Sequence, residues 1–286
     1  RSQTVTGVQT CALPIFTPRD ADHPERLAPV AEYIEAQFAP HTERVTDQPY
    51  TVDGTMVRNV IARFGPETGA RIVVGAHHDT AGPYPGADDN ASGVAGLLEL
   101  ARLMDGADLP CPVELVSYPL EEPPYFYTHQ MGSAVHARAL RRNDVAVRAM
   151  LSLEMIGYFT EAPVSQSFPL FVLRPFYPSE GTFIAVVGRC GWGQCRLVTT
   201  IRDGMQASTS LPVRSINAPR FVPGVAFSDH LNYWHAGYDA VMITDTAFYR
   251  NPHYHAPSDT PDTLDYDRMA QVVDGVRGAL DALGNG

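Results

Sequence analysis

Over roughly its first half, the chain alternates between short apolar runs and apolar residues at helical spacing. Helical spacing predicts a helix over 23–38, which Pro40 ends, and further helices over 91–104 and 131–142. Short, largely apolar runs predict strands over 57–64, 71–76, 113–120 and 147–153. Because strands alternate with helices, we expect an α/β fold: a single domain with a mostly parallel mixed central sheet and helices on both faces.

The segment 158–225 has a less regular pattern, since prolines and glycines interrupt it. We predict a helix near 179–189 and a strand near 196–201 within it. Beyond it, the pattern predicts a helix over 228–236, a short strand over 240–243 and a long terminal helix over 263–283. The chain contains no internal repeat and no low-complexity segment, which favours one domain.

The first residues differ in character from the rest. Val5 to Ile15 reads VTGVQTCALPI, which resembles the in-frame translation of a sequencing adapter. We therefore interpret residues 1–16 as a non-native segment and expect one domain over 17–286. On this interpretation the native N-terminus is missing from the sequence.

Composition narrows the class of protein. The chain has 286 residues, of which 44% are hydrophobic, a fraction typical of globular domains. Its 32 acidic and 21 basic residues give a net charge of −11, which disfavours nucleic acid as a partner. No apolar run reaches the roughly 18–20 residues needed to span a membrane.

The cysteines do not suggest a metal site. None of the four forms a CxxC pair, so a thiolate zinc site is not expected. Cys190 and Cys195 are spaced so that they could close a small disulfide loop or remain two free thiols.

Histidines and carboxylates instead cluster where the predicted strands end. The clusters are His77-His78-Asp79, Asp88-Asp89, Glu121-Glu122, Glu154 and His253-Tyr254-His255. The carboxyl ends of parallel strands meet at one crevice, so we expect these side chains to converge. Gathered carboxylates repel one another unless cations lie between them. Zinc binds imidazole and carboxylate, and one shared carboxylate can hold two metal ions about 3.5–4 Å apart.

Six motifs in order carry a resemblance to a known family. They are GAHHDT, PGADDNASGVA, LEEPP followed by MGS, SLEMIGY, SDH, and DTAFYRNPHYH followed by SDT. Together, over about 24–283, they resemble the M28 family of zinc peptidases. The resemblance implies a zinc-exopeptidase-like fold, two Zn²⁺ ions and the hydrolysis of N-terminal residues from peptides.

The resemblance also implies a role for each matching residue. His77 and Glu154 match ligands of one zinc ion, and Glu122 and His255 match ligands of the other. Asp89 matches the carboxylate that bridges the two ions. Glu154 departs from the family pattern, because many members have Asp at this position.

Three further residues match catalytic or supporting positions. Glu121 matches the general base, which would take a proton from zinc-bound water and deliver it to the leaving amine. Asp79 matches the carboxylate that orients His77, although it could instead be a turn residue or helix cap. Tyr254 matches a tyrosine that stabilises the oxyanion in some members, and a packing role is nearly as well supported.

Several nearby residues have open roles. Asp88 could replace Asp89 as the bridge. Asp229 and His230 could contact the metal ligands without binding metal themselves. Asp259 could orient His255 or cap the approach to the terminal helix. We place four nearby histidines outside the set of metal ligands: His78, His230, His235 and His253.

The leading functional hypothesis is a di-zinc aminopeptidase with peptide substrates. A glutaminyl-cyclase-like acyltransferase with one zinc is an alternative on the same fold, and a non-catalytic binding domain is another. A carboxypeptidase would need a cationic clamp for the substrate carboxylate, for which Arg174, Arg220 and Arg250 are candidates. Because such relatives are often exported, we expect a secreted or periplasmic protein. The pattern does not fix the oligomeric state.

Overall fold

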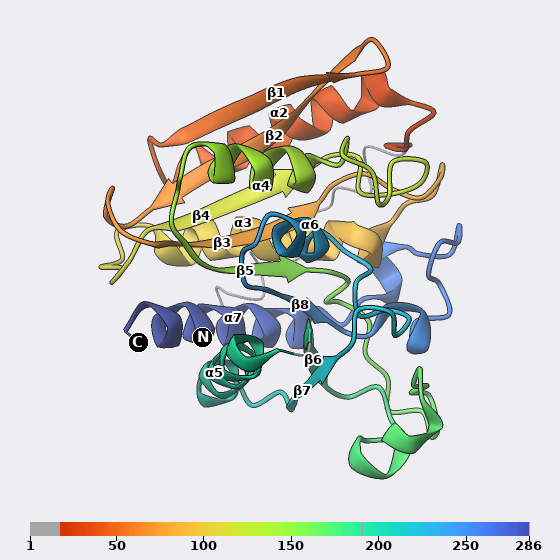
Figure 1. Cartoon of the computed structure of the whole chain (residues 1–286). Coiled ribbons are helices and arrows are strands. Elements are labelled where there is room, and N and C mark those ends of the chain that lie inside the picture. The colour runs from red at the N-terminus through yellow and green to blue at the C-terminus, as the bar shows by residue number, and fades with distance from the viewer. Residues whose placement is uncertain (1–17, 190, 286) are drawn as a thin grey trace.

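The computed structural model describes residues 18–189 and 191–285, and its centre is an eight-stranded mixed sheet (Figure 1). The strands are β1 (Val45–Val52), β2 (Thr55–Phe64), β3 (Arg71–His77), β4 (Val113–Tyr118), β5 (Val147–Leu153), β6 (Ile184–Arg189), β7 (Val213–Ala218) and β8 (Ala240–Thr244). Their order across the sheet is β1-β2-β4-β3-β5-β8-β6-β7.

The middle of the sheet is parallel. Strands β4, β3, β5 and β8 run in one direction, while β1, β2 and β4 are joined by antiparallel pairs. On the other side β6 pairs antiparallel with β8 and parallel with β7. The four central strands therefore end at the same edge, which is where ligands bind in open α/β sheets.

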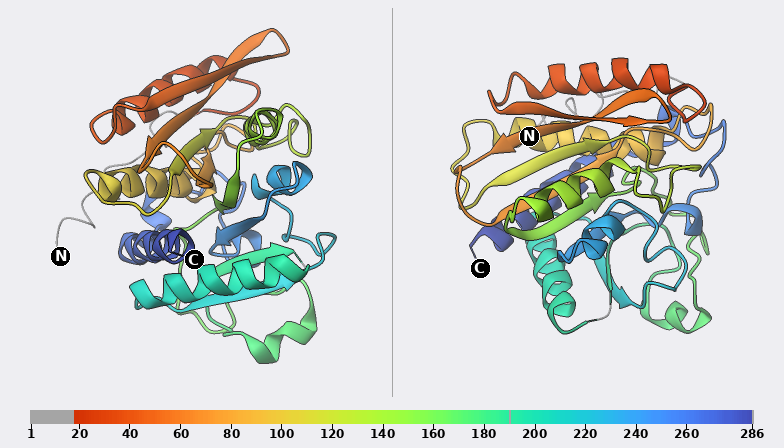
Figure 2. Two further views of the ribbon diagram at one scale, coloured as in Figure 1. Left: turned by 60° about the vertical axis from the view of Figure 1, so that its left-hand side comes forward. Right: turned by 45° about the horizontal axis from the view of Figure 1, so that its top comes forward.

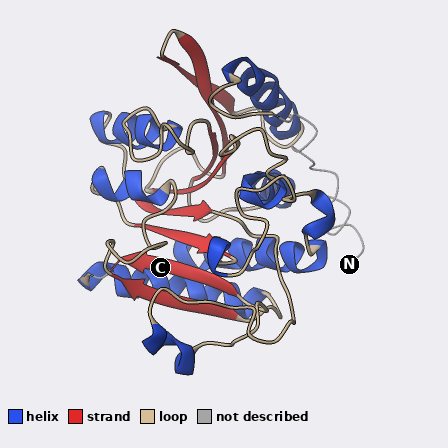
Figure 3. Ribbon diagram, turned by 90° about the vertical axis from the view of Figure 1, so that its right-hand side faces the viewer, coloured by secondary structure: helices blue, strands red, loops and turns tan. Residues whose placement is uncertain are grey.

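Helices cover both faces of this sheet (Figures 2 and 3). One layer contains α2 (Leu27–Phe38), α3 (Gly93–Met104), α5 (Trp192–Ser208) and α7 (Tyr266–Gly284). The other contains α4 (Gly132–Arg142) and α6 (His230–His235). Short helical turns complete the order: η2 (Pro24–Arg26), η3 (Ala87–Ser92), η4 (Phe171–Phe176), η5 (Ala247–Tyr249) and η6 (Pro261–Thr263).

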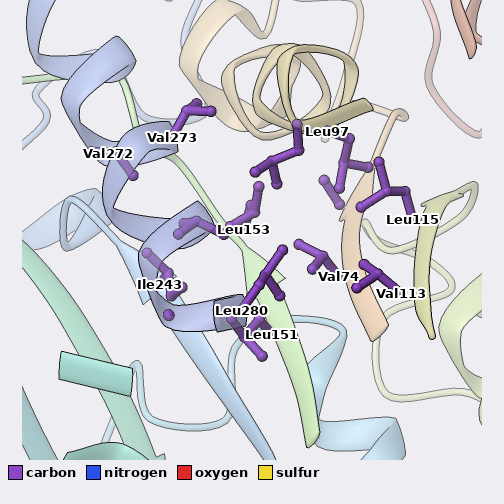
Figure 4. Packing of buried hydrophobic residues seen from close by; sticks show 14 of the residues in the cluster. Val74, Leu97, Val113, Leu115, Leu151, Leu153, Ile243, Val272, Val273 and Leu280 are labelled. Carbon is purple, nitrogen blue, oxygen red and sulfur yellow. The ribbon is translucent and has the colours of Figure 1, made fainter. Parts of the chain in front are cut away.

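Alternate residues of the central strands face opposite layers. Val74 of β3 packs in the core with α3 and α7, whereas its neighbour Val73 belongs to the core beneath α4 and α6. Figure 4 shows Leu280 of α7 beside Leu151 of β5, and Leu97 of α3 on the same side of the sheet as Leu153. Each fully buried side chain of this size contributes about 1.5–3 kcal/mol to stability. Two such cores hold the strand ends, and the loops that follow them, in fixed positions.

The predicted fold class is confirmed, but one stretch was assigned wrongly. The sequence pattern predicted a helix near 179–189 and a strand near 196–201, whereas the structure has strand β6 and then helix α5. A short apolar run is ambiguous by periodicity alone, and the branched residues of β6 favour a strand. In α5, Leu197, Ile201 and Met205 are buried and recur every fourth residue, which is helical spacing.

Other expectations concern features that the structure describes only in part. The predicted non-native segment 1–16 and Cys190 lie outside the described residues, so the proposed pairing of Cys190 with Cys195 stays a prediction. Within the described residues, neither Cys111 nor Cys195 forms a disulfide. Every helix within 18–189 and 191–285 is too short or too polar to cross a membrane.

Candidate metal centre

The predicted site residues lie at the carboxyl ends of the four central strands. His77 is the last residue of β3, and Glu154 directly follows β5. Glu121 and Glu122 lie in the loop after β4, which ends at Tyr118, and His255 lies in the loop that follows β8. Because these strands are parallel, their carboxyl ends lie at one edge of the sheet. This brings together residues as far apart in the sequence as His77 and His255.

The first candidate ligand group surrounds His77. Its Nε2 atom lies 3.4 Å from an Asp89 oxygen (Oδ1) and 3.4 Å from Oε2 of Glu154. All three side chains are buried, and they form one of the groups that could hold a metal ion. Glu154 also accepts a hydrogen bond of 2.7 Å from the Ser228 hydroxyl, which fixes the orientation of its carboxylate.

The second group surrounds His255 and shares Asp89 with the first. The Nε2 atom of His255 lies 3.1 Å from Oδ2 of Asp89 and 3.2 Å from Oε1 of Glu122. The two oxygens of Asp89 thus face different histidines, which is the geometry that a bridging carboxylate requires. A further group that could hold a metal combines His77 with Glu121 and Glu122.

The chemistry of these donors fits zinc. Within the described residues, three buried polar atoms that point into the two ligand groups have no hydrogen-bond partner: Nε2 of His77, Oδ1 of Asp89 and Nε2 of His255. Leaving such an atom unsatisfied costs about 1–3 kcal/mol. Imidazole nitrogen and carboxylate oxygen are the ligands that zinc prefers in catalytic sites. Cations bound here would therefore satisfy atoms that the protein alone leaves unpaired.

The histidines and carboxylates of the site shift the pKa values of one another. Burial would lower the pKa of His77, but the Glu154 and Glu121 carboxylates outweigh it and raise the pKa well above its ordinary value. Burial likewise opposes protonation of His255, yet the two carboxylates beside it raise its pKa to about 10. Burial raises the pKa of Glu122 to about 8, and that of Glu121 well above its usual range. Without metal, protons occupy this cluster, so metal binding must release them.

Asp79 connects the first histidine to the glutamate pair. Its carboxylate lies 3.4 Å from Nδ1 of His77, the nitrogen that faces away from Asp89 and Glu154. The same carboxylate accepts hydrogen bonds from the backbone amides of Glu121 (3.1 Å) and Glu122 (3.0 Å). Asp79 therefore fixes the position of the Glu121–Glu122 segment relative to His77.

Asp259 holds the loop that carries Asp89 in a similar way, a role that the sequence did not predict. Its carboxylate accepts hydrogen bonds from the backbone amides of Asp88 (2.9 Å) and Asp89 (3.1 Å). The terminal helix is capped by Asp265 instead, whose side chain accepts from the amide of Arg268. The only signal in the sequence was the position of Asp259 shortly after the His255 motif.

The neighbouring candidates face elsewhere. Asp88 accepts hydrogen bonds from the Gly157 amide (2.9 Å) and from Nδ2 of Asn251 (2.7 Å), so Asp89 rather than Asp88 faces the histidines. Asp229 is buried, and burial raises its pKa to about 7. The other histidines contact different partners: His78 the Ser117 hydroxyl, His230 the Val225 carbonyl and His253 the Ser258 hydroxyl.

Comparison with known proteins shows the family of this chain. The sequence profile of peptidase family M28 matches residues 59–280, which is most of the chain. The chain belongs to peptidase family M28. It is 49% identical over 267 residues to "Uncharacterized protein YfbL" of Escherichia coli (strain K12), covering 91% of this chain and 81% of that protein.

More distant relatives of this M28 chain have named activities. It is 26% identical over 229 residues to "Leucine aminopeptidase 1" of Fusarium vanettenii, covering 74% of this chain and 52% of that protein. The chain thus spans about half the length of the fungal leucine aminopeptidases that it matches. The family and these relatives support a hydrolase of the metallo-exopeptidase class, as the motifs predicted.

Solved structures share the fold. The LapA aminopeptidase of Legionella pneumophila matches with a TM-score of 0.75 at 18% identity, covering 100% of this chain and 72% of that chain. A glutaminyl cyclase of Bacteroides thetaiotaomicron matches with a TM-score of 0.70 at 20% identity, covering 99% and 97%. Because one fold carries both activities, the fold alone does not identify the reaction of this M28 chain.

Tyr254 lies between the metal-ligand groups and a large pocket. Its ring stacks on that of His255, with centroids 3.8 Å apart and an angle of 18° between the planes. It also lines an open pocket, of which Glu154 forms another part. The packing role considered for Tyr254 is therefore present, and its predicted contact with an oxyanion stays a prediction.

The pocket beside Glu154 is mainly apolar. Its lining includes Phe168, Phe183, Val187, Val225, Met242 and Phe248. Strands β6 and β8 form its floor through the side chains of Val187 and Met242, and the segments 166–177 and 222–227 contribute walls. An apolar side chain that enters this pocket would come close to the metal-ligand cluster.

Replacing Asp79 by Asn tests its link to the glutamate pair. Asn offers one acceptor oxygen in place of two, so one of the two backbone amides loses its partner. We expect the free energy of unfolding of the metal-free protein to fall by about 1–3 kcal/mol in a urea titration. The exposed Asp108→Asn is the control and should change it by less than about 0.5 kcal/mol. Equal stability of the two variants would contradict the role of Asp79.

Proposed function

We propose that this M28 protein is a di-zinc aminopeptidase that removes single N-terminal residues from peptides. The observation that carries the proposal is the orientation of Asp89, whose two oxygens lie 3.4 Å from His77 and 3.1 Å from His255. His77 and Glu154 would hold one zinc ion with Asp89, and Glu122 and His255 would hold the other. A site for a single structural metal would not need a shared carboxylate between two histidines.

The residues around the metal ligands support hydrolysis. Zinc, when bound, would supply a water of lowered pKa and an electrophile for the scissile carbonyl. Glu121 has a buried carboxylate 3.8 Å from Nε2 of His77, and burial raises its pKa. A carboxylate within reach of the reacting water can accept its proton and return it to the leaving amine. Glu121 is therefore the proposed general base.

The apolar pocket supports a preference for the first residue of the substrate. Glu154 and Tyr254 border it, so a side chain bound there belongs to the residue whose carbonyl reacts at the metals. The pocket excludes charged side chains, because the cost of desolvating them is not offset by a partner. We propose that large apolar N-terminal residues, such as Leu or Phe, are preferred over Asp, Glu, Lys and Gly.

The experiment that tests this function is hydrolysis of aminoacyl arylamides by zinc-loaded protein. We expect the Leu and Phe derivatives to have the highest kcat/KM and the Glu derivative the lowest. Ala185→Phe places a larger side chain in the pocket from β6. It should lower kcat/KM for the Leu derivative while leaving that for the Ala derivative within about threefold. Binding each methylene group in an apolar pocket contributes about 1–3 kcal/mol, and only the larger substrate loses that contribution. No hydrolysis across the whole panel would refute the aminopeptidase proposal.

Other observations bear on the two alternative activities. A metal content near one zinc per chain, with cyclisation of N-terminal glutamine, would instead identify a glutaminyl-cyclase-like acyltransferase. Carboxypeptidase action lacks support, because none of the three candidate arginines lines the pocket beside Glu154. Arg174 lies over the exposed Phe171 ring, and Arg250 is buried against Phe183.

A further inference from the structure

A buried arginine lies behind the metal-ligand loops. The guanidinium of Arg19 donates three hydrogen bonds, all to backbone carbonyls: Nε to His78 (2.8 Å), and the two terminal nitrogens to Pro85 (2.6 Å) and Gly86 (2.7 Å). Its side chain has no exposed surface. His78 directly follows the ligand His77, and Gly86 precedes Asp89 by one short turn. One side chain thus joins the loops that carry the proposed ligand of one ion and the proposed bridge.

The backbone around Arg19 is fitted to this contact. Gly86 has a left-handed φ of 55°, and a Cβ atom there would lie 2.9 Å from the Arg19 guanidinium and 2.3 Å from the Thr80 side chain. The amide of Thr80 donates in turn to the carbonyl of Arg19 at 3.3 Å. The segment at residue 19 is therefore held to the first ligand loop by its backbone and to both loops by its side chain.

The charge of Arg19 does not favour cation binding. Burial lowers the pKa of Arg19 to about 10, opposed by the nearby carboxylates of Asp79 and Asp259, so the group is positive at neutral pH. A positive charge close to a cation site weakens binding of that cation. A purely electrostatic view therefore predicts that removal of Arg19 strengthens zinc binding. A geometric view predicts the opposite, because free loops must be ordered when the metal binds.

We propose that Arg19 is a positioning residue that holds the His77 loop and the Asp89 loop at the spacing that two metal ions need. This inference rests on the proposed function, because it assumes that these loops bind zinc. A lysine cannot replace it, since a planar guanidinium reaches three carbonyls at once and an ammonium on a flexible stem does not. Together with Asp79 and Asp259, Arg19 fixes the backbone beneath the metal-ligand cluster.

The test compares zinc binding in Arg19→Met, Arg19→Lys and the control Arg26→Met, which changes an exposed arginine nearby. Zinc affinity is measured by competition with a chromophoric chelator, per mole of folded protein. We expect both Arg19 variants to bind zinc about 10- to 100-fold more weakly, as is usual when a residue that orients a metal ligand is lost. Arg26→Met should match the unsubstituted protein.

A second measurement separates positioning from general stability. The rise in Tm that zinc produces should shrink in both Arg19 variants, whereas a merely structural role would lower Tm equally with and without zinc. Tighter or unchanged zinc binding in Arg19→Met would overturn the positioning role, and so would full recovery of affinity in Arg19→Lys. Failure of the unsubstituted protein to bind zinc would overturn the proposed function and this inference together. Normal zinc binding by the unsubstituted protein, with unchanged binding by Arg19→Met, would overturn the inference alone. The two failures are therefore distinguishable.

Discussion

Replacement of Glu121 by Gln will lower kcat by about 10²- to 10⁴-fold, the usual contribution of a general base. Gln has the same shape and can still accept a hydrogen bond, but it cannot take a proton. Because Glu121 is buried and lies beside His77 without being needed by either group that shares Asp89, its loss should leave those groups intact. We therefore expect zinc content and KM to change little.

The adjacent Glu122→Gln is the matched control for this prediction. Glu122 lies 3.2 Å from His255 and belongs to the second ligand group, so its replacement should reduce zinc content as well as activity. Kinetics with an aminoacyl arylamide and zinc analysis of both variants separate the two roles. A rate unchanged in Glu121→Gln, or a loss of zinc in that variant equal to the loss in Glu122→Gln, would exclude Glu121 as the base.

The sequence placed the candidate site at strand ends, which are easy to locate from an apolar pattern. Each proposed ligand ends a buried apolar strand or lies in the segment that follows one, and a parallel sheet brings such ends together whatever their separation in the chain. Pattern also assigned the correct type to the central strands β3, β4 and β5. The ligand residues themselves were identified from motifs, and the structure shows that they lie within contact distance of one another.

The supporting residues could not be predicted because their partners are backbone groups. Asp259 accepts from two backbone amides, and Arg19 donates to three backbone carbonyls, so no complementary side chain marks either contact in the sequence. The strands at the ends of the sheet were missed for another reason. β1 contains Pro49 and is mostly not buried, and β7 is only half-buried over its middle, so neither presents a clear apolar run.

Replacement of Asp89 by Asn should remove at least one of the two zinc ions. An Asn side chain offers one oxygen ligand, and its NH₂ group cannot bind a cation, so one ligand group is left with two residues of its three. Loss of a direct ligand should exceed the 10- to 100-fold change that is typical for residues behind the ligands. We expect zinc binding at one site to weaken by more than about 100-fold, with activity lost in parallel.

The neighbouring Asp88→Asn is a demanding control for the Asp89 prediction, because both residues are buried acids in the same turn, η3. Asp88 accepts from the Gly157 amide and Asn251 and faces away from the histidines, so its replacement should destabilise the fold by about 1–3 kcal/mol while zinc content per folded chain stays at two. Zinc analysis combined with urea unfolding measures both effects. If Asp88→Asn loses zinc and Asp89→Asn does not, Asp88 is the bridge. If both variants keep two ions, the shared carboxylate is not required, and the di-zinc arrangement on which the proposed function depends is wrong.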